Sequence, residues 1–257
     1  MTDPLPRTEF RHARFADVLA HGPGLADRVA GSPGLHRRQV AARQLCQALG
    51  RLRVLGLEHV PAAGPVILAV NHTSFMDGPL LFGLLRRPVS FLVKAEAFEP
   101  AGGLAGVVLR GAGQLPVRRS QVDPAPVRYA LALLEAGGVL GMFPEGTRGR
   151  GLAHQVRPGV GYLAVRTGAP VLPVAVLGTA GMLRSAGRGP VSVRIGSPLR
   201  FARAAPGPLH RTRWLAAAEA VRRALVDQVR LGMAEQPAVE PGSPPPGSPA
   251  PRTTMGG

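Results

Sequence analysis

Five short runs of mostly apolar residues constrain the fold of this 257-residue chain more than any other feature of its sequence. One of them, Val66–Val70, is continuously apolar, which is typical of strands that are buried on both faces of a sheet. Segments with helical spacing separate most of these runs, and alternating strands and helices predict an α/β domain. The five runs are Val66–Val70, Val89–Val93, Val139–Phe143, Val171–Val176 and Val191–Ile195.

Shorter patterns complete the predicted order of elements. Two further strands are predicted, at Arg53–Leu57 and Gln114–Val117. The predicted helices cover Arg37–Leu49, Leu80–Leu85, Leu104–Leu109, Pro124–Glu135, Val160–Arg166 and Arg211–Met233. We therefore predict a single α/β domain with a central, mainly parallel or mixed sheet flanked by helices. The pattern does not specify the order of the strands in the sheet.

Apolar periodicity predicts which side of a helix faces the core. On the helix Pro124–Glu135 the predicted inner residues are Val127, Leu131 and Leu134. On the helix Arg211–Met233, which has the clearest periodicity, they are Trp214, Ala218, Val221, Leu225 and Val229.

The helix Arg37–Leu49 has two interpretations. In the first it packs on the domain with Val40, Leu45 and Leu49 toward one side. In the second it lies on a membrane surface, because its flanking arginines suit anionic headgroups. The sequence leaves both interpretations open.

The two ends of the chain differ in composition from its middle. Residues 1–35 mix short helical possibilities with Gly and Pro, so we expect an N-terminal segment that is partly ordered. Residues 36–234 make up the predicted domain. Residues 235–257 are rich in Pro, Gly and Ser and cannot bury enough apolar surface to fold, so we expect a disordered tail.

Composition excludes several classes of protein. Cys46 is the only cysteine, which excludes an intramolecular disulfide framework and a multi-cysteine zinc site. The first thirty residues carry charges throughout and lack the apolar core of a secretory signal. No stretch offers the roughly 20 apolar residues that a transmembrane helix needs. We therefore expect any membrane contact to be peripheral.

The formal net charge is +16, and nearly all of the excess is arginine, since Lys94 is the only lysine. GC-rich coding also favours arginine, so the count alone is weak evidence for a function. Residues 121–234 carry 15 Arg against 5 acidic residues, so the excess lies in the predicted domain. Such a surface favours anionic partners, such as phosphates, an acidic carrier protein, nucleic acid or anionic lipid.

The segment Asn71–Asp77, which reads NHTSFMD, follows the apolar run Val66–Val70 directly. Ligands of α/β folds bind at such strand ends. His72 can accept a proton near neutral pH. Asp77, five residues on, can fold back to hold the other ring nitrogen and stabilise the imidazolium. The alternative is structural, with His72 capping the turn and Asp77 capping the following helix.

A second turn, Phe143–Arg148, also follows an apolar strand and reads FPEGTR. Its Pro and Gly force a sharp bend that lets the backbone approach a ligand, and Arg148 can bind a phosphate with two hydrogen bonds. The alternative is an ordinary strand exit with a solvated arginine. Together with the histidine and aspartate, this turn supplies groups for moving an acyl group onto the hydroxyl of a phosphorylated acceptor.

Three more basic sites follow strands or open a helix. In Gly113–Arg119 the pair Arg118 and Arg119 follows a short strand, and only one of two adjacent residues faces a given ligand. Lys94 closes another strand, and Arg157 opens a helix whose N-terminal N–H groups attract anions. For each site the alternative is a solvated charge at an ordinary strand or helix end.

These motifs together resemble the 1-acylglycerol-3-phosphate acyltransferase family, within the glycerolipid acyltransferases. The resemblance covers about Arg51–Gly178, half of the chain. Asn71–Asp77 matches the N-H-x-S-x-x-D block, also called HX4D, and Phe143–Arg148 matches the third block. Gly113–Arg119 and Val171–Val176 resemble the second and fourth blocks.

The resemblance implies a role for each matching residue. His72 is the expected general base, and Asp77 is expected to orient it while the acceptor hydroxyl attacks the acyl thioester directly. Pro173 is expected to shape the acyl region. Arg118 stands where many relatives carry an acidic or neutral residue, which leaves open whether Arg118 or Arg119 holds the phosphate. The expected binding residues for the acceptor are Arg119, Glu145, Gly146, Thr147 and Arg148, with Lys94 and Arg157 as further candidates.

The resemblance implies an O-acyltransferase of phospholipid biosynthesis that converts 1-acylglycerol-3-phosphate to phosphatidic acid. Acyl-CoA or acyl carrier protein is the expected donor, with no metal or other cofactor, at the inner face of the cell membrane. One alternative is the same chemistry on glycerol 3-phosphate, another lysolipid or a glycolipid. The other is a non-catalytic basic protein that binds membrane or nucleic acid, although aromatic residues, at 4%, offer few platforms for stacking bases.

Overall fold

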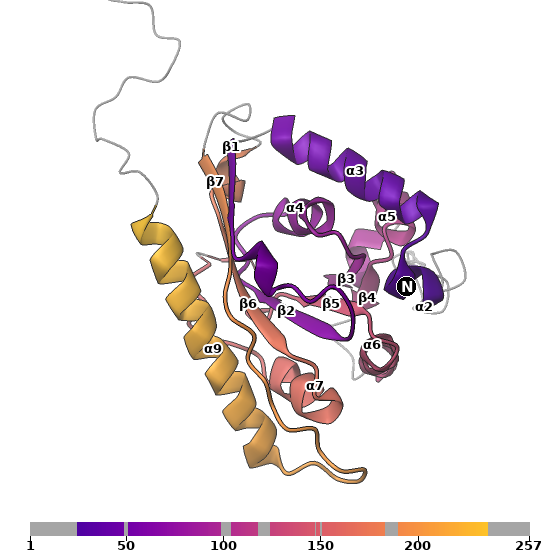
Figure 1. Ribbon diagram of the computed structural model, residues 1–257, viewed down its shortest axis with the longest axis vertical. Helices are drawn as coiled ribbons and strands as arrows, with labels where there is room; N and C mark the ends of the chain where they lie inside the picture. Colours follow the sequence, from indigo (N-terminus) through magenta and orange to yellow (C-terminus); the bar gives the residue numbers. More distant parts are fainter. Residues whose placement is uncertain are drawn as a thin grey trace, which may run out of the picture.

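The described part of the chain is built around a seven-stranded sheet (Figure 1). This computed structural model describes residues 25–48, 51–98, 104–117, 124–146, 148–149, 151–182 and 190–235. The strands are β1 (Arg51–Leu55), β2 (Val66–Val70), β3 (Val89–Lys94), β4 (Leu115–Val117), β5 (Val139–Met142), β6 (Val171–Leu177) and β7 (Pro190–Ile195). They are arranged in the order β1-β7-β6-β2-β5-β3-β4. All neighbours are parallel except β6 and β7, which confirms the predicted mainly parallel, mixed sheet.

Strand β2 lies between β5 and β6, and all five of its residues are buried. Near its end, Ala69 is in register with Met142 of β5, and Val70 is in register with Val174 of β6. Because these three strands are parallel, their carboxyl ends meet at one edge of the sheet, where α/β folds place ligands. The polar residues that follow β2 and β5 are therefore brought together at that edge.

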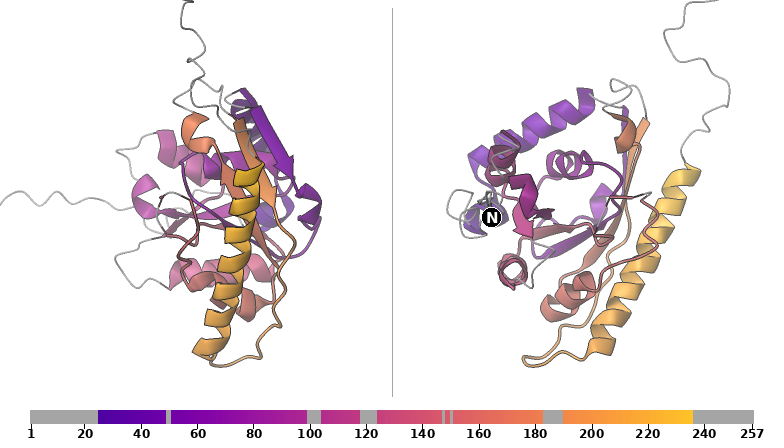
Figure 2. Two further views of the ribbon diagram at one scale, coloured as in Figure 1. Left: turned by 90° about the vertical axis from the view of Figure 1, so that its left-hand side faces the viewer. Right: turned by 180° about the vertical axis from the view of Figure 1, so that it is seen from behind.

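Helices cover both faces of the sheet, and Figures 1 and 2 show α3 and α4 on the side opposite α9. Alternate residues of β2 point to opposite faces. Leu68 therefore packs in the cluster with α3 and α4, and Ile67 in the cluster with α6, α7 and α9. The helices are α2 (Leu25–Ala30), α3 (Pro33–Ala48), α4 (Asp77–Leu84), α5 (Leu104–Gly111), α6 (Ala125–Glu135), α7 (Gly159–Thr167), α8 (Thr179–Met182) and α9 (Arg211–Ala234), with 3₁₀ turns η1 (Leu57–His59) and η2 (Ala95–Phe98).

Each strand and helix predicted from the sequence is present, with ends that differ by a few residues. Strand β1 ends two residues earlier than predicted, because Gly56 adopts a left-handed backbone with φ of 77°. On α6 the predicted inner residue Val127 is exposed, while Leu134 is buried. The stripe predicted for α9 is confirmed at Ala218, Val221, Leu225 and Val229, which are buried.

The predicted inner side of α3 is wrong. Val40 is 41% exposed and Leu45 is 53% exposed, while Leu49 lies outside the described residues. The buried residues of α3 are instead Leu35, Gln39 and Cys46.

A polar side chain, Gln39, explains this orientation of α3. Its Nε2 donates hydrogen bonds to the carbonyl groups of Phe82, Leu85 and Arg87, at and just after the end of α4. The last carbonyls of a helix have no partner within the helix. The need to satisfy them therefore turns Gln39, rather than the apolar Val40, toward α4.

None of the helices in the described ranges is both long enough and apolar enough to cross a bilayer. The predictions for residues 1–24 and 236–257 concern residues outside those ranges.

Candidate active site

A hydrogen-bonded pair, His72 and Asp77, stands at the carboxyl end of β2. His72 Nδ1 lies 2.9 Å from Asp77 Oδ2, and Asp77 is fully buried as the first residue of α4. The same Oδ2 accepts backbone N–H groups of Thr73 and Ser74, each at 2.9 Å. Asp77 therefore orients the imidazole and holds the turn before α4. It is itself the first residue of α4 and the N-cap Met76 makes no side-chain cap hydrogen bond, so the helix cap that the alternative interpretation predicted is not formed.

The contact with Asp77 decides which nitrogen of His72 can react. A carboxylate accepts hydrogen bonds, so Nδ1 carries the proton of the neutral ring and Nε2 presents its lone pair. Within the described residues no group forms a hydrogen bond with Nε2, and the side chain is 16% exposed. His72 can therefore accept a proton at its accessible edge.

Aromatic stacking holds the imidazole plane. The ring of His72 lies on Phe143, with centroids 4.0 Å apart and an angle of 19° between the planes. Phe143 stacks in turn on Phe91, at 5.2 Å and 15°. One face of the imidazole is therefore covered by the first residue of the FPEGTR turn.

The next residues of that turn hold the backbone of His72. Glu145 Oε1 accepts the backbone N–H of His72 at 2.9 Å, and the N–H of Gly149 donates to the carbonyl of His72 at 3.0 Å. Burial raises the pKa of Glu145 above its ordinary value, although hydrogen bonds from the backbone N–H groups of His72 and Ala153 lower it in part. The segment after β5 therefore holds both the backbone N–H and the backbone carbonyl of His72.

Asn71, the only asparagine of the chain, joins three segments at the site. Its fully buried side chain donates to the carbonyls of Gly151 and Val176, each at 3.1 Å, and accepts the N–H of Val176 at 2.7 Å. Gly151 has φ of 67°, and a Cβ there would stand 2.2 Å from Thr73 Cγ2. Only glycine therefore fits this close approach of the loop to the end of β2.

Comparison with known proteins places this geometry in a family. Residues 51–177 match the family model described as Acyltransferase. A lyso-ornithine lipid O-acyltransferase from Pseudomonas aeruginosa is 36% identical over 185 residues, covering 66% of this chain and 68% of that relative. The chain belongs to the glycerolipid acyltransferase family.

Two further relatives agree with this assignment. A 1-acyl-sn-glycerol-3-phosphate acyltransferase from Bacillus subtilis is 26% identical over 163 residues, covering 63% of this chain and 80% of that relative. The crystal structure of a 1-acyl-sn-glycerophosphate acyltransferase from Thermotoga maritima shares the fold. Its TM-score is 0.52 at 23% identity, over 75% of this chain and 79% of that chain. The chain is thus an acyltransferase, which argues against the non-catalytic binder that the sequence left open.

Some of the basic residues that were predicted to bind the acceptor lie within the described part of the chain. Arg148 and Arg157 are exposed near the turn, and Arg157 Nε lies over Gly146, where a Cβ would be 2.1 Å from it. The backbone N–H of Arg157 donates to the carbonyl of Pro144 at 2.7 Å, which closes the loop between these two residues. Lys94 is exposed at the end of β3.

Arg118, Arg119 and Thr147 lie outside the described residues, so their roles stay predictions. Pro173 is buried within β6, and its carbonyl accepts the N–H of Gly196 just beyond the end of β7. In the described ranges no three His, Cys, Asp or Glu side chains form a group that could hold a metal ion.

Two contacts of this acyltransferase site could not be predicted from the sequence. Phe143 was part of a recognised block, but its stacking on His72 has no sequence signal. Thr179 lies just outside the recognised blocks, yet its hydroxyl donates to Asp77 Oδ1 at 2.5 Å. The close pairing of β2 with β6, which the sequence does not specify, brings Thr179 to this position.

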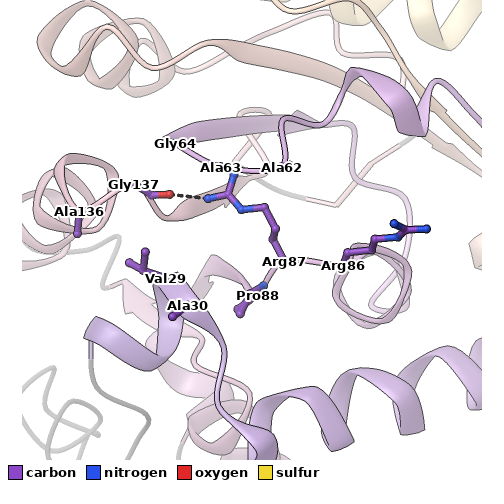
Figure 3. A pocket seen from close by; sticks show the side chains of 10 residues that line it. All are labelled: Val29, Ala30, Ala62, Ala63, Gly64, Arg86, Arg87, Pro88, Ala136 and Gly137. Carbon is purple, nitrogen blue, oxygen red and sulfur yellow. Dashed lines mark hydrogen bonds between the residues drawn. The ribbon is translucent and has the colours of Figure 1, made fainter.

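A cavity of about 300 Å³ lies among residues that precede β2, β3 and β5, at the opposite edge of the sheet (Figure 3). Gly64, Pro88 and Gly137 line it, and Arg87 donates hydrogen bonds to the carbonyls of Gly137 and Pro61. These bonds satisfy backbone groups at the starts of strands. We assign this cavity no part in acyl transfer.

Proposed function

We propose that this acyltransferase moves a fatty acyl group from an acyl thioester to the free hydroxyl of 1-acylglycerol-3-phosphate, giving phosphatidic acid. The observation that carries the proposal is the oriented His72, whose Nε2 is accessible while Nδ1 is held by buried Asp77. This arrangement suits general base catalysis on a hydroxyl that the substrate itself supplies.

In the proposed mechanism His72 Nε2 takes the proton of the acceptor hydroxyl as its oxygen attacks the thioester carbonyl carbon. Asp77 stabilises the imidazolium that forms. The C–S bond then breaks, and the leaving thiolate takes the proton back from His72. The donor is acyl-CoA or acyl carrier protein, there is no acyl-enzyme, and we expect no metal or other cofactor to take part.

The proposed acceptor site combines the turn after β5 with the strand ends beside it. Arg148 is exposed on the turn, where its guanidinium can bind a phosphate with two hydrogen bonds. Lys94, Arg157 and the predicted Arg118 and Arg119 would add positive charge. The Bacillus subtilis relative, named for 1-acyl-sn-glycerol-3-phosphate, supports a phosphate-bearing acceptor.

A second acceptor deserves a direct test, because the Pseudomonas aeruginosa relative is named for a lyso-ornithine lipid and shares 36% identity. The catalytic pair would act in the same way on either acceptor. The two candidates differ in the headgroup that the turn after β5 would bind. An assay that compares the two acceptors directly is therefore needed to decide between them.

The decisive assay offers the purified chain one labelled acyl thioester and a panel of acceptors. The panel holds 1-acylglycerol-3-phosphate, lyso-ornithine lipid, glycerol 3-phosphate and a neutral lysolipid. We expect the fastest transfer to 1-acylglycerol-3-phosphate, and we expect Arg148→Ala to raise the acceptor KM with little change in the donor KM. Arg128→Ala, an exposed arginine on α6, is the matched control. Preference for lyso-ornithine lipid, or an effect of Arg148→Ala on the donor alone, would refute this assignment.

We further propose that α3 rests on the membrane that holds the lipid acceptor. Its solvent-facing residues Arg37, Val40, Ala41, Leu45 and Ala48 follow helical spacing, and all are exposed. An outward stripe of apolar residues beside arginine is typical of helices that lie in the interface of an anionic bilayer. This supports the second interpretation of the helix and a peripheral position at the inner face of the membrane.

A further inference from the structure

Thr179 reaches the carboxylate that orients His72 from a distant part of the chain. It begins α8, just after β6, and lies 102 residues from Asp77 in sequence. Strand β6 runs parallel to β2, and Val174 is in register with Val70. The chain that leaves β6 therefore passes beside the turn that leaves β2, where Thr179 is buried.

The chemistry of the carboxylate fixes the direction of these hydrogen bonds. Asp77 can only accept, so the hydroxyl of Thr179 donates its proton to Oδ1, at 2.5 Å. A hydroxyl has one proton, so Thr73 must be the donor in the 3.2 Å contact between Thr73 Oγ1 and Thr179 Oγ1. A chain of hydrogen bonds therefore runs from Thr73 through Thr179 to Asp77.

The two oxygens of Asp77 have separate partners. Oδ2 accepts His72 Nδ1–H and two backbone N–H groups, whereas Thr179 is the donor that the described residues provide to Oδ1. Asp77 has no solvent exposure, so bulk water does not reach it. Without the hydroxyl of Thr179, one oxygen of a buried carboxylate loses its donor, and the carboxylate is less firmly held in the plane that suits Nδ1.

We propose that Thr179 is a positioning residue for catalysis, which fixes the rotation of the Asp77 carboxylate and so the orientation of His72. Thr179 touches no reacting atom and acts through Asp77. The inference rests on the proposed role of His72 as general base. A hydrogen bond to a charged group corresponds to a change of roughly 10- to 100-fold in an equilibrium or rate.

The test compares Thr179→Val, which keeps the size of the side chain but removes the donor, with Thr179→Ser, which keeps the hydroxyl. We expect Thr179→Val to lower kcat by roughly 10- to 100-fold with the KM values of donor and acceptor little changed. Thr179→Ser should recover most of the activity. These assays use whichever acceptor of the panel above reacts fastest. The test of Thr179 therefore does not depend on which lipid the natural acceptor is.

A matched control distinguishes a positioning role of Thr179 from the effect of removing any buried hydroxyl group. Thr167→Val removes a buried threonine hydroxyl that bonds the carbonyl of Leu163 within α7. We expect it to lower the Tm without lowering kcat. In a double-mutant cycle, Thr179→Val should cost little further activity in the Asp77→Ala background, because the two residues act as a unit.

Three results would overturn the positioning role of Thr179 while the proposed function stood. In the first, His72→Ala is inactive but Thr179→Val keeps the wild-type kcat. In the second, Thr167→Val loses as much kcat as Thr179→Val, and in the third, Thr179→Ser is no more active than Thr179→Val. If His72→Ala itself turns over at the wild-type rate, the proposed function fails instead. The two failures are thus distinguishable in one set of assays.

Discussion

Single buried amide side chains complete the backbone hydrogen bonding at both ends of the sheet. Asn71 bonds the backbone of β6 and of the loop at Gly151. Gln114 accepts the N–H of Phe91 and donates to the carbonyls of Val89 and Ala112. Buried backbone groups that lack a strand or helix partner are costly unless a side chain bonds them. The burial of Asn71 and Gln114 is therefore explained by the backbone groups that they bond.

Glu145 gives a pH-dependent prediction at the residue scale. Its pKa is raised in the folded protein, so the folded state binds its proton more tightly than the unfolded state does. Stability from this group is therefore present at low pH and is lost as the pH rises through the raised pKa. Glu145→Gln keeps an oxygen for the N–H of His72 and does not ionise. We expect its Tm relative to wild type to rise over the pH range that begins at about pH 4, the ordinary pKa of a glutamate, and extends through the raised pKa.

Thermal unfolding of both proteins across this range measures the difference. Glu135→Gln is the control, because Glu135 is exposed and its carboxylate lies 3.8 Å from Arg203. Its Tm relative to wild type should show no such rise. A Tm difference for Glu145→Gln that does not change with pH would contradict the raised pKa of this carboxyl group.

The sequence allows prediction of local pairs at the site but not of distant ones. His72 and Asp77 are five residues apart across one turn, so the hydrogen bond between them could be predicted as one of two interpretations of this spacing. Thr179 meets Asp77 only because β6 lies beside β2. Glu145 was predicted to bind the acceptor, and the structure shows that one of its oxygens bonds the N–H of His72.

At the scale of elements, runs of mostly apolar residues made the strands predictable, whereas the orientation of α3 could not be predicted. The burial of Gln39 depends on the carbonyls at the end of α4, which no periodicity reveals. The exposed Val40 and Leu45 are then available for another contact. This is the observation on which the proposed membrane contact of α3 rests.

The membrane contact of α3 can be tested with the double variant Val40→Ser, Leu45→Ser. Each change removes an exposed apolar side chain, so the fold should persist while binding to phosphatidylglycerol vesicles weakens by roughly tenfold. Vesicle co-sedimentation measures the binding. Val127→Ser removes an apolar side chain of similar exposure (42%) on α6 and should bind as wild type does. Equal binding by the double variant and wild type would exclude α3 from the contact.

At the scale of the whole molecule, the order of the strands decides which residues form the site. The sheet places β2 between β5 and β6, so segments after residues 70, 142 and 177 converge at one edge. The sequence indicated an α/β fold but not this order, because strand pairing depends on contacts between distant segments. Much of the net charge of +16 comes from residues 121–234, and we propose that the few basic residues at this edge bind the acceptor.

The central claim is that His72 is the general base of acyl transfer, and one measurement tests it most directly. Transfer of a labelled acyl group to the fastest acceptor is followed for wild type and for His72→Ala, with circular dichroism and Tm as controls for folding. General base catalysis contributes roughly 10²- to 10⁴-fold, so we expect His72→Ala to lose at least about 100-fold in kcat while remaining folded. Turnover of a folded His72→Ala protein near the wild-type rate would contradict the mechanism.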